Sequence, residues 1–307
     1  MDSLKGRDLL SMADLSSAEL HDLLKLAAQL KAGTIQPQCP NKVLGLVFSK
    51  ASTRTRVSFS VAMYQLGGQV LDLNAGVTQV GRGEPTADTA RVLDRYLDVV
   101  AIRTFQQSEI EEFARYASIP VINALTDLEH PCQILADLLT LQESFGTLEN
   151  LTMSYLGDGN NVAHSLMLGC ALAGVNIRVA TPDGYAPESS VVAQAKAIAQ
   201  DRSEVVVTQD PKAAAQNSHA LYTDVWASMG AETEAASRMP KFQPYQINQT
   251  MLDLAHPQAI ILHCLPAHRG EEITNDAMEG PQSRLWDQAE NRLHAQKALL
   301  AAILSES

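Results

Sequence analysis

The chain has 307 residues, of which 46% are hydrophobic and 19% are charged, and this length and composition suit a globular protein of two ordinary domains. Its formal net charge of −12 argues against nucleic acid and anionic membranes as partners, because both need a positively charged footprint. No apolar run approaches the roughly 18 residues of a membrane span, and the acidic amino terminus is not typical of a signal peptide.

The chain contains four cysteines, which are far apart and form no Cys-x-x-Cys pair. Such spacing is typical of free thiols in a reducing compartment rather than of a disulfide framework. We therefore expect a cytoplasmic protein.

The first half of the chain alternates between apolar runs typical of buried strands and stretches with helical spacing. A helix is expected over residues 16–31, where Leu20, Leu23 and Leu24 fall on one stripe. Ser52 is expected to cap the second helix, and Pro131 suits the first turn of a later one. Strands are expected over 43–48, 70–73, 99–102 and 120–122, and further helices over 53–66, 86–96, 108–116 and 131–145.

The same alternation begins again after Gly146. Strands are expected over 151–156, 177–180, 205–207, 220–223 and 259–262, and helices over 161–173 and 287–304. Strands that alternate with helices form parallel sheets covered by helices. We therefore predict two α/β domains, each with a central parallel sheet flanked by helices, and an active site in the cleft between them. The predicted domains are 1–147, joined by the terminal helix at about 287–307, and 148–286.

The sharpest local pattern is Ser52-Thr53-Arg54-Thr55-Arg56, which directly follows a predicted strand and opens a predicted helix. A helix start offers free backbone N–H groups and a partial positive charge, so anions bind there readily. The hydroxyl groups add short donors, and the guanidinium of Arg54 adds a planar fork suited to phosphate oxygens. The string predicts a phosphate site in a chain whose overall charge is negative.

This string is identical to the carbamoyl-phosphate motif of the aspartate and ornithine carbamoyltransferases, and the chain resembles that family from about residue 5 to its carboxyl terminus. Three further stretches match in the right order: His130-Pro131-Cys132-Gln133 followed by Leu135-Ala136-Asp137, then Asp224-Val225-Trp226-Ala227-Ser228-Met229-Gly230, then His263-Cys264-Leu265-Pro266.

The resemblance implies a carbamoyl-phosphate site and three catalytic residues, Arg103, His130 and Cys264. Thr55, Arg103 and His130 would stabilise the negative charge on the carbamoyl oxygen in the transition state, as an oxyanion hole does. Gln79 falls in a loop that in this family can reach a neighbouring subunit's site. The implied ligands of carbamoyl phosphate are Ser52, Thr53, Arg54, Thr55, Gln79, Arg103, His130, Gln133, Cys264, Leu265 and Arg292.

The second domain decides between aspartate and ornithine as the acceptor. Aspartate carbamoyltransferases usually carry a lysine in the loop that here is Gly81-Arg82-Gly83-Glu84, and Pro-Leu-Pro where this chain has Cys264-Leu265-Pro266. Ornithine instead needs a carboxylate for its ammonium and amide or hydroxyl groups beside it. The resemblance implies that ornithine is bound by Asn161, Asp224, Ser228 and Met229.

Cys264 would lie beside the reaction centre, where the matching cysteine of the family is credited with orienting the amine or accepting its proton. A packing role remains a third interpretation. No metal or organic cofactor is expected. A zinc site is only weakly indicated by His263, Cys264 and His268, because no fourth ligand is evident in the sequence.

The expected activity is transfer of the carbamoyl group from carbamoyl phosphate to the side-chain amine of L-ornithine, giving L-citrulline and phosphate in arginine biosynthesis. The resemblance also implies a homotrimer. Two alternatives stay open: another amine acceptor such as putrescine or an acylated ornithine, and a binding or regulatory protein that has lost catalysis. The sequence does not decide the direction of the reaction.

Overall fold

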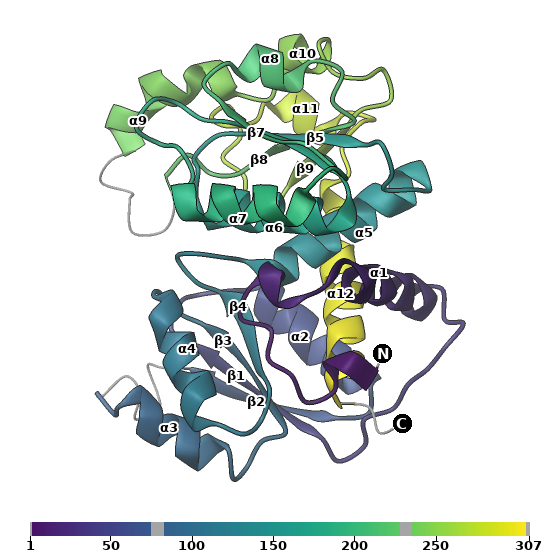
Figure 1. The fold of residues 1–307 in the computed structure, drawn as a ribbon, viewed down its shortest axis with the longest axis vertical. Coiled ribbons are helices and arrows are strands. Elements are labelled where there is room, and N and C mark those ends of the chain that lie inside the picture. Colours follow the sequence, from purple (N-terminus) through teal and green to yellow (C-terminus); the bar gives the residue numbers. More distant parts are fainter. Residues whose placement is uncertain (1, 75–82, 228–234, 305–307) are drawn as a thin grey trace. The chain divides into compact units, whose positions relative to one another are not determined.

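The computed structural model describes residues 2–74, 83–227 and 235–304. The chain divides into two compact units, of which unit 1 comprises Met1–Leu139 with Asn291–Ser307 and unit 2 comprises Thr140–Glu290. Each unit contains a parallel sheet between layers of helices (Figure 1), so the predicted fold class is confirmed. The division falls inside a helix, whereas the sequence predicted a change of domain after residue 147.

The sheet of unit 1 has the strand order β2-β1-β3-β4, and all of its pairs are parallel. Its strands are β1 (Val43–Phe48), β2 (Gln69–Asn74), β3 (Val99–Arg103) and β4 (Val121–Leu125). From β1 the chain passes first to β2 on one side and later to β3 on the other. The order therefore reverses between β1 and β3, and ligands of open parallel sheets bind beyond the carboxyl ends of the strands at such a point.

Helices cover both faces of this sheet (Figure 1). Those that lie in unit 1 are α1 (Ser17–Lys31), α2 (Arg54–Gln65), α3 (Thr86–Leu93) and α4 (Gln107–Tyr116), with the first part of α5 (Pro131–Phe145) and the last part of α12 (Leu285–Leu304). Helices α3 and α4 pack on one face through a core that includes Val47, Val100, Ile110 and Phe113. Helix α12 lies beside α2, where Ser58 Oγ donates to Gln296 Oε1 at 2.5 Å.

The sheet of unit 2 has the order β7-β6-β5-β8-β9, again with every pair parallel. Its strands are β5 (Thr152–Leu156), β6 (Asn176–Ala180), β7 (Val205–Thr208), β8 (Ala220–Thr223) and β9 (Ile260–His263). Its helices are α6 (Asn161–Ala173), α7 (Ser189–Ala199), α8 (Pro211–Ala215), α9 (Ala235–Phe242), α10 (Gln249–Leu252) and α11 (Asn275–Glu279). Here the order reverses between β5 and β8.

The predicted strands and helices are confirmed with boundary shifts of a few residues. The largest are in α3, which ends at Leu93 rather than at Tyr96, and in β4, which ends at Leu125 rather than at Ile122. The expected cap at Ser52 is wrong. Thr53 occupies the N-cap position of α2 with a right-handed helical backbone (φ −81°, ψ −57°), and no side chain among the described residues caps the helix. A side-chain cap needs an extended backbone at that position, which Thr53 does not have.

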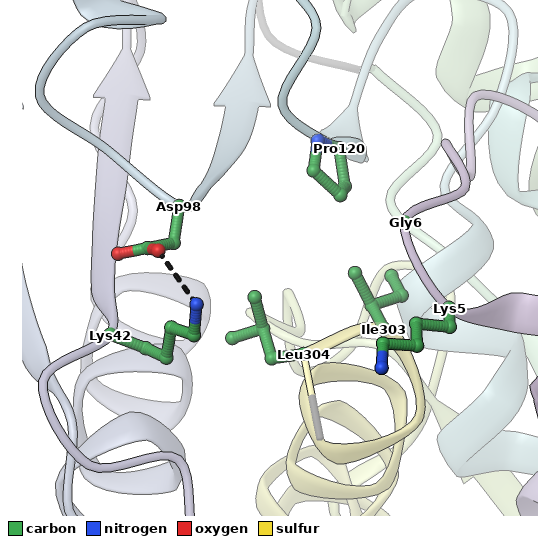
Figure 2. Close-up of a pocket in the computed structure, with 7 residues that line it drawn as sticks. All are labelled: Lys5, Gly6, Lys42, Asp98, Pro120, Ile303 and Leu304. Atoms are coloured by element: carbon green, nitrogen blue, oxygen red, sulfur yellow. Dashed lines mark hydrogen bonds and ion pairs between the residues drawn. The ribbon is translucent and has the colours of Figure 1, made fainter. Parts of the chain in front are cut away.

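A cavity of about 430 Å³ lies at the amino ends of the strands of unit 1 (Figure 2). Lys42, Asp98 and Pro120, which line it, each directly precede a strand. Lys42 Nζ donates to Asp98 Oδ1 at 3.1 Å, so its charge is already matched. This cavity is at the edge opposite to the predicted site residues. None of the described helices is both long and apolar enough to cross a lipid bilayer.

Helix α1 begins with a capping box, in which Ser16 accepts from the backbone of Glu19 and Glu19 accepts from the backbone of Ser16. Replacing such a cap with alanine typically costs about 1 kcal/mol. We expect Ser16→Ala to lower the midpoint of thermal unfolding, measured by circular dichroism. Ser17→Ala, one residue inside the helix, is the control, and an equal effect of the two variants would contradict the assignment.

Candidate active site

The predicted phosphate residues of unit 1 meet at the point where its strand order reverses. Ser52 to Thr55 follow β1, and Arg103 is the last residue of β3. The two strands are paired, with Phe48 opposite Arg103, and Ser49 N donates to Arg103 O at 2.9 Å. This pairing brings the start of α2 next to the end of β3.

A buried hydrogen-bond network joins three distant parts of the sequence. Arg292 Nη2 donates to Thr55 Oγ1 at 2.8 Å, and Arg292 Nη1 donates to Gln133 Oε1. Gln133 Nε2 in turn donates to Asp137 Oδ1 at 2.8 Å. All four of these residues are at most 2% exposed, so the network fixes the orientation of Thr55 and Gln133.

His130 directly precedes α5 and is buried. Burial lowers its pKa well below the usual value, and the guanidinium groups of Arg292, Arg103 and Arg54 lower the pKa further. The imidazole is therefore neutral at physiological pH and acts as a hydrogen-bonding group rather than as a cation. The same effect shows that the charges of three arginines act on one buried position, which suits the binding of an anion by this acidic chain.

Glu129 anchors the segment that presents His130, a role that the sequence analysis did not identify. Its buried carboxylate accepts hydrogen bonds from Met12 N at 3.0 Å and from Ser11 Oγ. The arrangement ties the turn before α5 to the amino-terminal segment. A single acidic residue beside a histidine is too common a pattern to predict this contact.

Arg56, the last residue of the phosphate motif, has a different role from Arg54. It forms an ion pair with Asp72 on β2, and its guanidinium lies over the ring of Phe48. The positive charge of Arg56 is therefore neutralised by Asp72 within unit 1.

The acceptor residues predicted in unit 2 likewise follow neighbouring strands. Asp224 comes directly after β8, Cys264 directly after β9, and Asn161 opens α6 after β5. These three strands are adjacent in the sheet. The parallel order therefore gathers the three residues at one edge, at the second reversal point.

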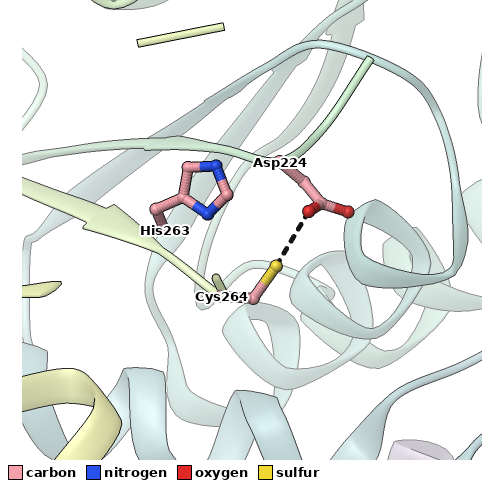
Figure 3. A group of neighbouring side chains, drawn as sticks. All are labelled: Asp224, His263 and Cys264. Atoms are coloured by element: carbon pink, nitrogen blue, oxygen red, sulfur yellow. Dashed lines mark hydrogen bonds between the residues drawn. The ribbon is translucent and has the colours of Figure 1, made fainter. Parts of the chain in front are cut away.

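Asp224 is held from two sides and is only 7% exposed. Cys264 Sγ donates to its Oδ1 at 2.9 Å, as Figure 3 shows, and Asn160 Nδ2 donates to its Oδ2 at 2.9 Å. Asn160 is also the N-cap of α6, where its Oδ1 accepts from Val162 N and Ala163 N. One residue thus fixes both the helix start and the carboxylate.

Asn160 is a residue that the sequence analysis missed, because it singled out Asn161 beside it. An asparagine directly before a helix is an N-cap signal, and that signal could have found it. Asn161 is the first residue of α6 and is partly exposed. Gln79, Ser228 and Met229, which the sequence also assigned to the site, lie outside the described residues.

The segment after β9 has an unusual backbone. Leu265, predicted to contact carbamoyl phosphate, has a positive φ of 59°, a conformation that non-glycine residues rarely adopt. Its N–H donates to His263 Nδ1 at 2.9 Å. Gln288 Oε1 accepts from His263 N at 2.8 Å, so buried polar contacts hold this segment from behind.

Asp224, His263 and Cys264 bring possible metal ligands within 4.8 Å of one another. However, both ring nitrogens of His263 are engaged, Nδ1 by Leu265 N and Nε2 by the buried Glu272 at 3.0 Å. A metal would have to displace one of these bonds. His268, part of the zinc pattern weighed from the sequence, groups instead with Glu271 and Glu272.

Both units of this chain match a protein family that is already described. The family model described as the carbamoyl-P binding domain of aspartate/ornithine carbamoyltransferase matches residues 7–143, and the Asp/Orn binding domain model of the same family matches residues 149–303. The ornithine carbamoyltransferase of Nostoc punctiforme is 71% identical over 304 residues, covering 99% of each chain. That of Thermosynechococcus vestitus is 72% identical, covering 99% of this chain and 98% of its own.

Solved structures agree with these matches. The ornithine carbamoyltransferase of Pyrococcus furiosus has a TM-score of 0.94 and 47% identity, and 98% of each chain is covered. That of Gloeobacter violaceus has a TM-score of 0.90 and 60% identity, with 97% of this chain and 98% of the other covered.

Asn160 offers a test of how unit 2 holds its buried carboxylate. Asn160→Asp keeps a good N-cap but replaces the donor to Asp224 with a second carboxylate. Two neighbouring carboxylates raise each other's pKa in the folded state, so the destabilisation is full at neutral pH and shrinks as the pH falls towards about 4. Thermal unfolding across this pH range measures the effect. Asn160→Ser, a cap of similar quality without the added charge, is the control, and equal pH profiles for the two variants would contradict the contact.

Proposed function

The chain belongs to the aspartate/ornithine carbamoyltransferase family, and we propose on that premise that it transfers the carbamoyl group of carbamoyl phosphate to the side-chain amine of L-ornithine, giving L-citrulline and phosphate. The observation that supports this most strongly is the full-length identity of 63–72% to relatives named ornithine carbamoyltransferase. The arrangement of polar groups in each unit suits one of the two substrates.

Unit 1 binds carbamoyl phosphate in this proposal. Ser52, Thr53 and Arg54 hold the phosphate at the uncapped start of α2, where backbone N–H groups and the helix dipole favour an anion. Arg103 spans the phosphate and the carbamoyl oxygen. The roles of Thr55 and His130 are to stabilise the oxyanion.

Gln133 and Arg292 contact the carbamoyl group from the network that joins them to Thr55. Because His130 is neutral, it donates a hydrogen bond without adding a charge that would have to be desolvated. Gln79, Cys264 and Leu265 complete the set of carbamoyl-phosphate ligands.

Unit 2 binds ornithine in this proposal. The buried carboxylate of Asp224 pairs with an ammonium group, since an opposite charge is what a desolvated cation requires. Asn161, Ser228 and Met229 bind the amino-acid head group. Asn160 acts as a positioning residue, because it holds Asp224 through its amide.

The chemical step forms a bond between the amine nitrogen and the carbamoyl carbon and breaks the bond from that carbon to the phosphate oxygen. A free alkyl amine has a pKa near 10, so the nitrogen must lose a proton before or during attack. Cys264 donates its hydrogen to Asp224 in this structure. The Cys264–Asp224 pair orients the neutral amine, and the departing phosphate takes up the proton that the nitrogen releases as the new bond forms. A Cys264 thiolate that accepts this proton is the alternative to be tested.

We further propose that the protein works in the cytoplasm as a homotrimer, in the biosynthetic direction of arginine metabolism. The four cysteines are all free thiols, which suits a reducing compartment. Val57 and Tyr64 on α2 and Leu71 on the edge strand β2 are exposed apolar side chains of unit 1, which a contact between subunits would cover. A relative of 35% identity from Campylobacter jejuni is named as an anabolic enzyme.

The activity is tested by measuring initial rates with carbamoyl phosphate and three acceptors: ornithine, putrescine and aspartate. Ornithine should give by far the highest kcat/KM, because it alone supplies both a second amine and an α-carboxylate that suits the amide groups beside Asp224. A higher value for putrescine would move the assignment to another amine. Absence of product with every acceptor would favour a binding protein.

The start of α2 provides a matched pair of arginines. Arg54→Ala should lower kcat/KM by about 10²–10³, the usual cost of removing one donor from such a site, with a native circular dichroism spectrum. Arg56→Ala, whose side chain is paired with Asp72, should change kcat/KM much less. Equal activity of Arg54→Ala and the unaltered protein would refute the phosphate assignment.

Cys264 can be tested by isosteric replacement. If Cys264 orients Asp224 and the amine by hydrogen bonding, Cys264→Ser should keep much more activity than Cys264→Ala, because the hydroxyl still donates. If a thiolate accepts the proton, both variants should lose activity to the same extent. Steady-state rates of citrulline formation distinguish the two results.

A further inference from the structure

Unit 1 contains a second cavity, of about 200 Å³, that the reaction does not use. It lies between the end of α1, the segment over residues 33–38, the end of α2 and the buried part of α12. Its polar lining is Gln36, Gln38, Gln65 and Lys297, and its apolar lining includes Leu30, Ile35 and Leu66. The predicted phosphate site is at the opposite end of α2, which at 12 residues is about 18 Å long.

Lys297 lines this cavity, and no acidic side chain in the described part of the chain pairs with its charge. The residue is only 9% exposed, and its Nζ donates to Gln65 Oε1 at 2.8 Å. Within the described part of the chain it makes no ion pair, and no carboxylate or other titratable group lines the cavity beside it. An ammonium has three donors, so donors remain for a ligand, and burying it without an anion is costly.

We propose that this cavity binds a small aliphatic carboxylate, whose negative group pairs with the ammonium of Lys297. The glutamine amides supply further donors to the carboxylate oxygens. Leu30 and Leu66 cover the alkyl part of the ligand. A single ammonium matches the single charge of a carboxylate, whereas a phosphate dianion is normally held by several cations or by a row of backbone N–H groups.

The affinity of this site for a carboxylate should depend on pH, because the ligand pairs with the ammonium group of Lys297. Burial lowers the pKa of Lys297 in the empty cavity. A bound carboxylate favours the charged form and raises that pKa again. Binding is therefore strong while Lys297 is protonated, and it weakens as the pH rises through the pKa of the empty site.

The test uses the full chain with lysine labelled by ¹³C at Cε, and two probes of nearly the same shape, butyrate and butyramide. The NMR signal of Lys297 is assigned by its absence in Lys297→Met. Butyrate should shift this signal saturably, and butyramide should not, because it lacks the charge. Lys297→Arg keeps the positive charge and also lacks this signal, so it provides the assignment if Lys297→Met unfolds.

Calorimetric titration measures the affinity of the protein for butyrate. Lys297→Met should bind at least about tenfold more weakly, the loss expected when a charge-assisted hydrogen bond is removed. Lys25→Met, which removes an exposed lysine of α1, should bind as the unaltered chain does. Equal shifts with butyrate and butyramide, no saturable shift with butyrate, or unchanged affinity in a folded Lys297→Met protein would each overturn the proposal.

Discussion

Three guanidinium groups around one buried imidazole are the constraint on which the rest of unit 1 depends. Arg54, Arg103 and Arg292 all act on His130, although they come from the start of a helix, the end of a strand and the terminal helix. Like charges repel, and the buried guanidinium groups of Arg103 and Arg292 must also be desolvated. Such a cluster persists when the fold holds every member and when an anion neutralises it. The parallel pairing of β1 with β3, the bonds from Arg292 to Thr55 and Gln133, and the anchoring of Glu129 supply that support.

Unit 2 has the same architecture but holds a buried negative charge where unit 1 gathers positive charges. Its strand order also reverses at the centre of a parallel sheet, but the group placed there is a buried carboxylate. Asp224 is held by the amide of Asn160 and the thiol of Cys264, both uncharged donors, so its negative charge remains for a cationic ligand. In the proposed function, an anion site in unit 1 and a cation site in unit 2 match the charges of carbamoyl phosphate and ornithine.

The sequence predicted the strands and most helices, because hydrophobic periodicity determines them. Most of the candidate site residues at the carboxyl ends of the strands were instead implied by the resemblance to the carbamoyltransferase family. Asn161–Ala173 and Pro131–Phe145 were predicted with their observed bounds. The residues that support the site were not predicted. Each supporting residue acts through a hydrogen bond to a residue far away in the chain, as Glu129, Asn160 and Gln288 show. Local sequence patterns do not predict such contacts. The expected cap at Ser52 was wrong because the backbone at Thr53 is helical, a conformation that the residue types alone do not predict.

The most direct test of the central claim is the crystal structure of this protein with carbamoyl phosphate alone. The account predicts that the phosphate lies at the start of α2, within hydrogen-bonding distance of Ser52 to Thr55 and with the guanidinium of Arg54 beside it. The carbamoyl oxygen should point towards Arg103 and His130. A phosphate bound elsewhere in unit 1, or on unit 2, with these arginines unoccupied would contradict the account.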